Sequence, residues 1–343
     1  MEGLLVWIAL FFLALSLYLY CLLGGADFGA GVHELFVRRS QKRAHEDLVK
    51  SAIGPVWEAN HMWLIIIVVI LFVGFPRAYS ELSIHLHVPL TLMLIGVILR
   101  GCAFSFRHYD SVEDGSRKIY SAVFSFSSLL TPIMFGVIIG AIMLGKIQAE
   151  PTDYYSTYIA PWANPFCLVV GLFVLSIFAF VAAIYMIGET GGEPFRVDYI
   201  GRAKIFHVLM IVMGAGVFAL AHVSGLPFYH QFFNNPLAIG AFTLATLSHL
   251  ALWRLFGVRA AWRLRLISGF QLLMVIVAWL AVISPNIIFY ADQSTLSLLD
   301  AAAGPGTMTM LVTALVVGVL IFLPLLIYLF AVFKGSSKPM QAI

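Results

Sequence analysis

The feature that most constrains this chain is the recurrence of long apolar runs. A helix that crosses ~30 Å of hydrocarbon at ~1.5 Å per residue needs about 20 apolar residues. Nine runs meet this requirement: residues 4–32, 56–75, 84–106, 119–145, 164–187, 203–223, 236–256, 266–285 and 306–332. The sequence therefore predicts an all-α, polytopic membrane protein with about nine transmembrane helices.

The composition supports this class and excludes several others. Of the 343 residues, 61% are hydrophobic and 11% are charged, whereas soluble domains carry roughly 25% charged residues. A water-soluble globule, a disordered chain, a fibrous repeat and a nucleic-acid-binding protein all need more charge than this. The three cysteines form no CxxC or CxxCH pattern, which argues against a disulfide framework, a zinc site and covalently attached haem.

No loop is long enough to hold a soluble domain. We therefore expect residues 1–343 to form one integral membrane domain, arranged as two four-helix bundles plus one further helix. The first run follows Glu2 instead of a basic segment and is longer than a signal peptide, so we expect it to be retained as a helix.

The basic residues give the orientation. Seventeen of the 20 Lys and Arg residues lie in the loops after spans 1, 3, 5 and 7 or in the C-terminal tail. They are Arg38, Arg39, Lys42, Arg43, Lys50, Arg107, Arg117, Lys118, Arg196, Arg202, Lys204, Arg254, Arg259, Arg263, Arg265, Lys334 and Lys338. Positive charge concentrates on the cytoplasmic side of membrane proteins. This pattern predicts a cytoplasmic C-terminus and, with nine crossings, an N-terminus outside.

Three charged residues interrupt the spans and are candidate functional residues. Asp27 lies near the inner end of span 1, Glu58 at the start of span 2 and Arg100 late in span 3. Charged residues in hydrocarbon are expensive and often mark ion or proton pathways. We expect the three to converge near the cytoplasmic side and to neutralise one another.

The residues around Glu58 extend this hypothesis. Trp57, Asn60 and His61 lie within one turn of it, and His61 shares its helix face at i+3. A carboxylate, an amide and an imidazole in one turn could form steps of a proton relay. A purely structural role is the alternative to a proton relay. Glu58 could be a first-turn glutamate facing the helix dipole, and Asp27 and Arg100 could be an ordinary interfacial pair.

Histidines could instead ligate haem iron. His207 and His222 lie on span 6, but span 7 offers only His249 as a counterpart. A di-haem four-helix arrangement would need a matching pair on the second helix. We therefore expect these histidines to make hydrogen bonds, and we expect no metal or cofactor ligand in this chain.

The motifs resemble subunit II of the cytochrome bd-type quinol oxidases. The resemblance lies in Gly25–Gly31 on span 1, Pro55–Leu64 on span 2, Phe75-Pro76 after it, and Leu99–Phe104 closing span 3. The span 2 motif is quite specific, whereas the later spans match only in pattern and length. The nine-span, N-outside topology is also similar to that of the family.

The resemblance implies a respiratory complex in the bacterial cytoplasmic (inner) membrane. In that family, subunit I carries two b-type haems, one d-type haem and the quinol site, while subunit II ligates no haem iron. The complex oxidises quinol on the outer side, reduces oxygen to water with cytoplasmic protons, and separates charge without pumping. Partners implied are subunit I, quinol, membrane lipid and small single-span accessory subunits, with a bound quinone in some subunits II.

Residue by residue, the resemblance assigns a proton path. Glu58 matches the acid that the family uses on the way to the oxygen site, and Asp27 and Arg100 match its intramembrane acid and arginine. Arg100 would adjust the protonation of both acids, while Trp57, Asn60 and His61 would shape the path. Two positions depart from the family: the acid at Glu58 is aspartate in well-known members, and Gly24 stands where many members have another acid.

Two alternative functions use the same residues differently. In a proton- or ion-coupled secondary transporter, the buried acids would be coupling sites, although such proteins usually show repeated halves and broken helices at the midplane. In a purely structural scaffold subunit, the buried charges would only pair with each other. The three hypotheses predict different effects of neutralising Asp27 or Glu58.

Overall fold

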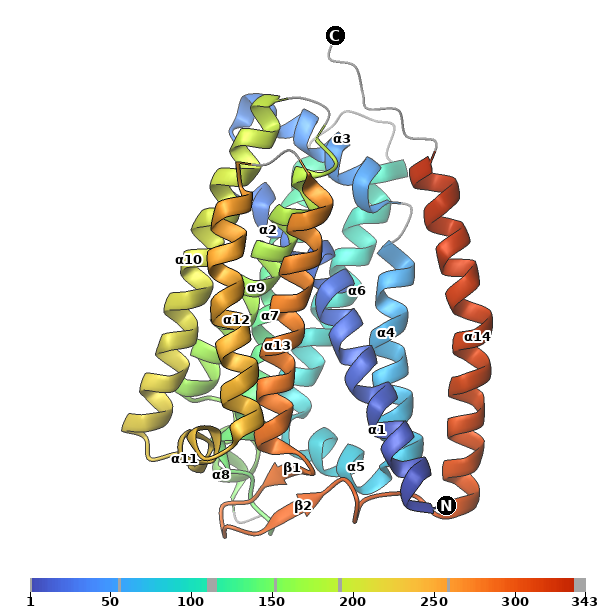
Figure 1. The fold of residues 1–343 in the computed structure, drawn as a ribbon, viewed down its shortest axis with the longest axis vertical. Coiled ribbons are helices and arrows are strands. Elements are labelled where there is room, and N and C mark those ends of the chain that lie inside the picture. The colour runs from blue at the N-terminus through green and yellow to red at the C-terminus, as the bar shows by residue number, and fades with distance from the viewer. Residues whose placement is uncertain are drawn as a thin grey trace.

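The fold is a bundle of long, roughly parallel and antiparallel helices. The computed structural model describes residues 2–54, 57–109, 116–150, 153–190, 193–257 and 260–335. Within these ranges, nine helices are long and apolar enough to cross a membrane. The first described residues lie at one end of the bundle and the last described residues at the other (Figure 1). The predicted all-α class and the nine crossings are confirmed.

The crossing helices account for most of the chain. In chain order they are α1 (Glu2–Leu19), continued by a π-helical turn (Tyr20–Gly24) and α2 (Gly25–Glu34); α4 (Trp57–Val69), continued by a second π-helical turn (Ile70–Gly74); α6 (His87–Tyr109); α7 (Ser116–Leu144); α9 (Pro165–Ile187); α10 (Glu193–Val223); α12 (Pro236–Leu255); α13 (Ala261–Ile283); and α14 (Pro305–Gly335).

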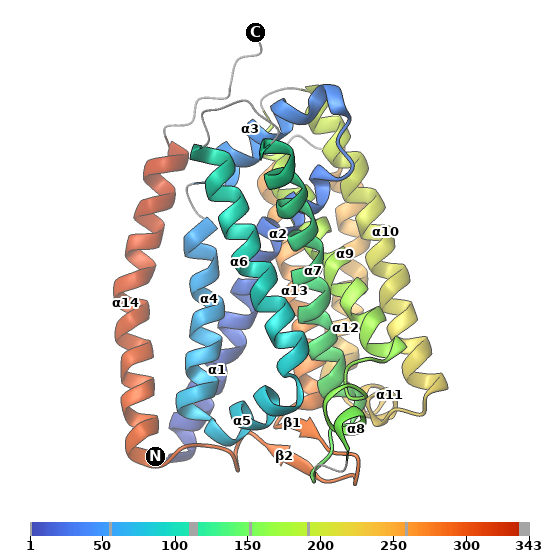
Figure 2. The same ribbon diagram turned by 180° about the vertical axis from the view of Figure 1, so that it is seen from behind.

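Shorter elements cover both ends of the bundle. A 3-10 turn (Arg39–Gln41) and α3 (Lys42–Ile53) lie at the end of the bundle where α14 ends. At the opposite end lie α5 (Pro76–His85), α8 (Tyr154–Tyr158), α11 (Pro227–Phe233) and a hairpin of β1 (Asn286–Phe289) and β2 (Thr295–Ser297) (Figure 2).

The first eight crossings form two adjoining four-helix groups. The α1–α2 helix, α4, α6 and α7 make the first group, and α9, α10, α12 and α13 make the second; α7 packs on α9 where they meet. Of the most apolar windows in α7 and α9, 67% and 72% of the residues are buried, against 11% in α14. The centre of the protein is therefore the α7–α9 pair, and α14 is a peripheral helix that packs on α1.

The α2 segment is wedged into this centre. All ten of its residues are buried. A Cβ atom on Gly29 would collide with the Phe178 carbonyl of α9, and one on Gly31 would collide with the Ser128 hydroxyl of α7. Because these two glycines lack side chains, α2 approaches both central helices closely. This approach places Asp27 in the interior of the protein.

Two connecting segments are more ordered than the sequence predicted. The polar segment after span 1, predicted from the sequence as a loop, contains α3, which buries Leu48, Val49, Ala52 and Ile53 on one face. Charged residues on its other face concealed this amphipathic helix. The antiparallel β1–β2 hairpin was also not predicted. Of the residues discussed above, Pro55, Val56, Arg259 and Lys338 lie outside the described ranges.

His45 anchors α3 to the bundle. Its ring stacks on Tyr199 of α10 with centroids 6.1 Å apart, and the side chain is buried. Burial above all, together with the neighbouring His33, Arg202 and Arg107, lowers the pKa of His45 from 6.5 to about 3. His45 is therefore neutral in the folded protein at neutral pH.

A pH-dependent stability follows from this burial. Below about pH 6.5 the unfolded histidine binds a proton that the folded one does not, so this group alone removes up to about 1.4 kcal/mol per pH unit as the pH falls towards about 3. His45→Phe keeps a ring against Tyr199 but cannot titrate. We expect the thermal midpoint to fall less between about pH 7.5 and about pH 5.5 in this variant than in the wild type. Equal falls would contradict the assignment.

Candidate functional site

A buried ion pair joins α2 to α6. Arg100 Nη2 donates to Asp27 Oδ1 at 2.6 Å and to the Asp27 backbone carbonyl at 3.0 Å. Both side chains are fully buried. A buried charge is tolerated only with a close partner, and removal of either partner leaves the other uncompensated. The convergence predicted for Asp27 and Arg100 is therefore present.

Aromatic rings complete the surroundings of the guanidinium group. Its Cζ atom lies 5.1 Å from the centroid of the Phe28 ring and 5.0 Å from that of Phe124. Arginine over an aromatic face gains a cation–π attraction that increases when water is excluded. Arg100 Nε and Nη1 are buried and have no hydrogen-bond partner among the described residues. The arginine thus keeps donor capacity beyond its bond to Asp27.

His61 brings α4 to the same acid. Its Nε2 atom lies 3.5 Å from Asp27 Oδ2, an oxygen that has no hydrogen-bond partner within the described ranges. The imidazole ring contacts Tyr20, Phe28 and Trp57, with centroids 5.5–6.3 Å apart for the last two. A small movement or one water molecule would connect His61 to the carboxylate.

Glu58 does not join this group. The side chain is exposed, and it forms no hydrogen bond or ion pair with any described residue. It lies one turn before His61, on the outer face of α4 that also exposes Met62, Ile65 and Phe72 (39%, 59% and 60%). The expected sharing of Arg100 between two carboxylates is not observed, because Asp27 faces the interior and Glu58 faces outward.

The other predicted residues of α4 lie between these two acids. Trp57 packs edge-on or tilted against His61 and Phe104, with ring centroids 6.3 and 5.6 Å apart. Asn60 is 5% exposed and faces the interior. Trp57, Asn60 and His61 therefore separate the outward Glu58 from the buried Asp27.

A second polar cluster was not predicted. His249 Nδ1 lies 2.5 Å from His207 Nε2, and Trp253 Nε1 donates to His207 Nδ1 at 3.0 Å. Gln271 Nε2 lies 2.8 Å from His249 Nδ1, and Phe180 stacks on His207. Because both ring nitrogens of His207 face protein groups, this donor set does not fit iron ligation. The lone histidines on spans 6 and 7 were the only sequence signal.

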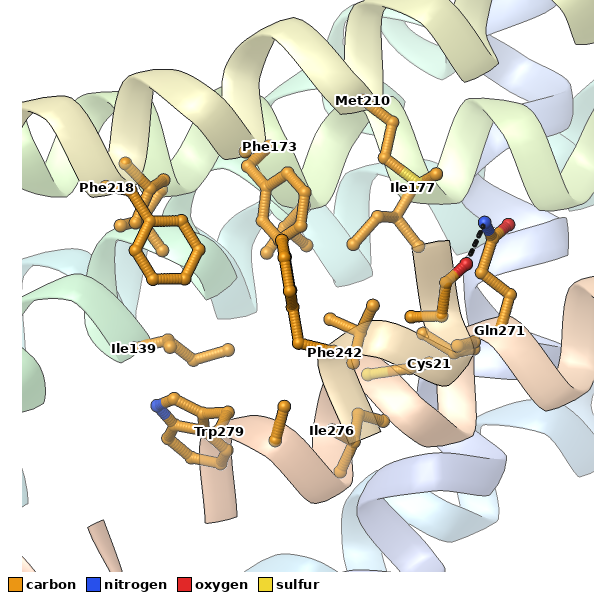
Figure 3. Close-up of a pocket in the computed structure, with 18 of the residues that line it drawn as sticks. Cys21, Ile139, Phe173, Ile177, Met210, Phe218, Phe242, Gln271, Ile276 and Trp279 are labelled. Atoms are coloured by element: carbon orange, nitrogen blue, oxygen red, sulfur yellow. Dashed lines mark hydrogen bonds between the residues drawn. The ribbon is translucent and has the colours of Figure 1, made fainter. Parts of the chain in front are cut away.

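This cluster borders an apolar cavity of about 390 Å³ between the two helix groups. Figure 3 shows Gln271 at one end, with its amide nitrogen directed to the Ala245 carbonyl at 3.4 Å, and rings such as Phe173 and Trp279 around the space. Gln271 Oε1 is buried without a hydrogen-bond partner among the described residues. The cavity is thus apolar with one polar end.

In the part of the chain that the structure describes, no group of three or more His, Cys, Asp or Glu side chains could hold a metal ion. The candidate site is the cluster of Asp27, Arg100 and His61, with Glu58 one turn away on the outer face of α4.

The comparisons with known proteins identify the family. The family model described as cytochrome bd terminal oxidase subunit II matches residues 4–333. The chain belongs to this family. It is therefore a multi-pass membrane protein of the bd oxidases, and the resemblance read from the first three spans is confirmed.

Individual relatives are distant. Cytochrome bd ubiquinol oxidase subunit 2 of Bacillus subtilis is 29% identical over 147 residues, covering 40% of this chain and 41% of that protein. Cytochrome bd-I ubiquinol oxidase subunit 2 of Escherichia coli K12 is 24% identical over 222 residues, covering 62% and 58%. The matches thus span about half the length of these relatives.

A solved structure shares the fold. The bd oxidase of Geobacillus thermodenitrificans matches with a TM-score of 0.76 and 18% identity, covering 97% of this chain and 99% of that chain. The two chains therefore share the same fold over nearly their whole length.

The buried pair predicts a large stability effect. Arg100→Leu leaves the Asp27 carboxylate buried without its cation, so we expect a loss of about 3–5 kcal/mol. Arg263→Leu is the matched control because Arg263 is exposed, and it should change stability by no more than about 0.5 kcal/mol. Thermal unfolding in detergent measures both. A similar small effect for the two variants would contradict the importance of the pair.

Proposed function

We propose that this chain is the subunit II partner of a haem-bearing subunit I, in a complex that oxidises quinol and reduces oxygen to water. In this proposal Asp27 and Glu58 carry protons from the cytoplasm towards the partner. The observation that carries the proposal is the position of His61 on α4, which lies 3.5 Å from the buried Asp27 and one helical turn from the outward-facing Glu58. This chain alone does not catalyse the reaction.

The outward-facing position of Glu58 indicates where the proposed proton path leaves this chain. A carboxylate that faces hydrocarbon is costly, and such residues normally face protein or a water-filled cavity. Glu58 lies on an apolar face of α4 that the described part of this chain leaves uncovered. The neighbouring α6 also exposes Leu94, Ile98 and Phe106 (54%, 53% and 58%). We place subunit I on this face, where it would cover Glu58.

Each side chain then has a distinct task. Asp27 holds a proton in the interior, and its bond to Arg100 keeps the acid in place. His61 lies within reach of Asp27 Oδ2 and can accept that proton or bind a water that does. Trp57 and Asn60 fix the segment of α4 that leads to Glu58. Glu58 presents the proton at the surface towards subunit I.

The haems belong to the partner in this proposal. Two b-type haems and one d-type haem held by subunit I would supply the electron transfer and oxygen reduction. The donor chemistry of this chain supports the assignment, because both ring nitrogens of His207 are engaged by protein groups. Quinol would be oxidised on the partner, and single-span accessory subunits would pack on the lipid-facing surface.

The orientation is part of the same proposal. The N-terminus lies outside and the C-terminus in the cytoplasm of a bacterial inner membrane, because the basic residues gather at the end where α3 lies. Protons would then enter from the α3 end, which is the end nearer Asp27.

A bound quinone fits the apolar cavity. Its volume of about 390 Å³ is within the usual range for ligand pockets, and Gln271 and His249 would provide polar contacts for a carbonyl head group. This role is separate from the proton path and does not depend on it.

Neutral variants of the two acids test the proton path. In the assembled complex, we expect Asp27→Asn and Glu58→Gln to slow quinol-driven oxygen uptake by roughly 100-fold, the scale for losing a proton-transfer group. Haem absorbance should be unchanged. Glu58→Asp keeps a carboxylate and should retain most of the rate, and Asp198→Asn, an acid half exposed at the surface, should have little effect.

The outcomes separate the alternative functions. Near-normal oxygen uptake in both neutral variants would remove the relay. Loss of assembly, with a normal rate for whatever complex remains, would favour a purely structural scaffold. A purified complex without haem absorbance would favour a proton- or ion-coupled transporter.

A further inference from the structure

A second acid–arginine pair repeats the first one. Arg107 Nη1 donates to Glu34 Oε2 at 2.8 Å, just as Arg100 donates to Asp27. Glu34 follows Asp27 by seven residues on α2, and Arg107 follows Arg100 by seven on α6. Seven residues span about two helical turns and ~10.5 Å. The two pairs therefore lie on the same faces, one above the other.

One ring connects the two pairs. Phe124 of α7 is fully buried, and its centroid lies 5.0 Å from Arg100 Cζ and 4.5 Å from Arg107 Cζ. Both guanidinium groups therefore pack on the same side chain. The two pairs and Phe124 form a single ladder that runs from the α3 end of the bundle to Asp27.

Glu34 occupies the outermost buried position of this ladder. The residue is 4% exposed. Its Oε1 atom has no hydrogen-bond partner among the described residues and lies 3.9 Å from Lys42 Nζ, on a side chain that is 41% exposed. One oxygen of this carboxylate is thus fixed by Arg107, while the other faces the solvent-exposed lysine.

Glu46 provides a contrast at the same end of the protein. It is also buried (6% exposed), but both of its oxygens are satisfied. Oε2 accepts from Arg117 Nη2 at 2.9 Å, and Oε1 accepts from Ser121 Oγ at 3.1 Å. Such a carboxylate is a structural cross-link with no free oxygen for a proton.

We propose that Glu34 is the carboxylate that takes up protons from the α3 end and delivers them to Asp27. Glu34 accepts a proton from solvent water at Oε1 and becomes a neutral acid. It then releases that proton towards the Asp27 carboxylate, which becomes neutral in turn, and Glu34 returns to its ionised form. No electrons move in this step.

The distance between the acids requires water. About 10 Å separates two groups seven residues apart on a helix, so the proton would pass along one or more buried waters. Buried waters bind where polar groups lack partners, and Arg100 Nε and Nη1 together with Asp27 Oδ2 are such atoms. The arginines hold the acids and the water in place, and they remain protonated.

This inference rests on the proposed proton path, and its test must separate the two. In the assembled complex we expect Glu34→Gln to lower quinol-driven oxygen uptake roughly tenfold or more, with unchanged haem absorbance. Glu34→Asp should restore most of the rate. Glu46→Gln is the matched control and should stay within about twofold of the wild type.

A pH profile distinguishes proton uptake from a structural role. If Glu34 collects protons, the rate of Glu34→Gln should fall more steeply with rising pH than that of the wild type, because protons then reach Asp27 from water alone. A merely structural defect would lower the rate by the same factor at every pH. That result would overturn the proposal.

A charge-neutral variant covers the case in which Glu34→Gln does not assemble. Glu34→Gln with Arg107→Gln leaves no unpaired charge, and Glu46→Gln with Arg117→Gln is its control. A slow first variant and a near-normal second one would support the role of Glu34. Near-normal rates in both, while Asp27→Asn is slow, would overturn this inference and leave the proposed path intact. Near-normal Asp27→Asn would remove the path itself.

Discussion

The structure depends on the ion pair between Asp27 and Arg100. A carboxylate and a guanidinium group without access to water are stable only at close range and with good geometry. Both conditions are met here. Arg100 contacts the Asp27 carboxylate at 2.6 Å, donates a second bond to the Asp27 carbonyl, and lies between two aromatic rings. Beside this pair, α4 packs on α1 and the Tyr20–Gly24 turn, and His61 approaches Asp27 from that helix.

Glycines make this pairing possible. Gly29 allows α2 to lie against the backbone of α9, and Gly31 allows it to lie against Ser128 of α7, so Asp27 reaches the interior at a depth where larger residues would hold the helix away. The two buried acid–arginine pairs, Asp27–Arg100 and Glu34–Arg107, then lie in the half of the bundle nearer α3. The far half is packed with apolar side chains such as Ile70, Phe75 and Phe166. This asymmetry is why the proposed proton path opens at one end.

Much of the fold could be predicted from sequence because hydrocarbon imposes simple rules. Span length and the distribution of Lys and Arg predict nine helices and their alternation. The pairing of Asp27 with Arg100 was also predictable, since few other partners exist in the first three spans. The outward direction of Glu58 was not, because the face that a residue takes depends on which neighbours α4 finds.

Other features depend on long-range packing that one sequence does not reveal. The contact between His207 and His249 joins residues 42 positions apart, and neither lies in a recognisable motif. Arg107 was counted as a loop charge and Glu34 lay beyond the predicted end of span 1, although their seven-residue offset from Asp27 and Arg100 was visible in the sequence. Because α2 and α6 run parallel, the equal offset places the two acid–arginine pairs one above the other.

The π-helical turn at Tyr20–Gly24 makes the first membrane-crossing helix sensitive to the deletion of a residue. A π-helical turn carries one residue more than an α-turn, so it advances the helix by about 100° of rotation. Before it, α1 exposes Leu4, Trp7 and Phe11; after it, every residue of α2 is buried. The turn therefore changes the rotation of the helix between α1, which exposes apolar side chains on one face, and α2, which is fully buried. Deleting one residue from the Tyr20–Gly24 turn would restore regular α-helical geometry. It would rotate Asp27 away from Arg100, although neither of these two residues had been changed.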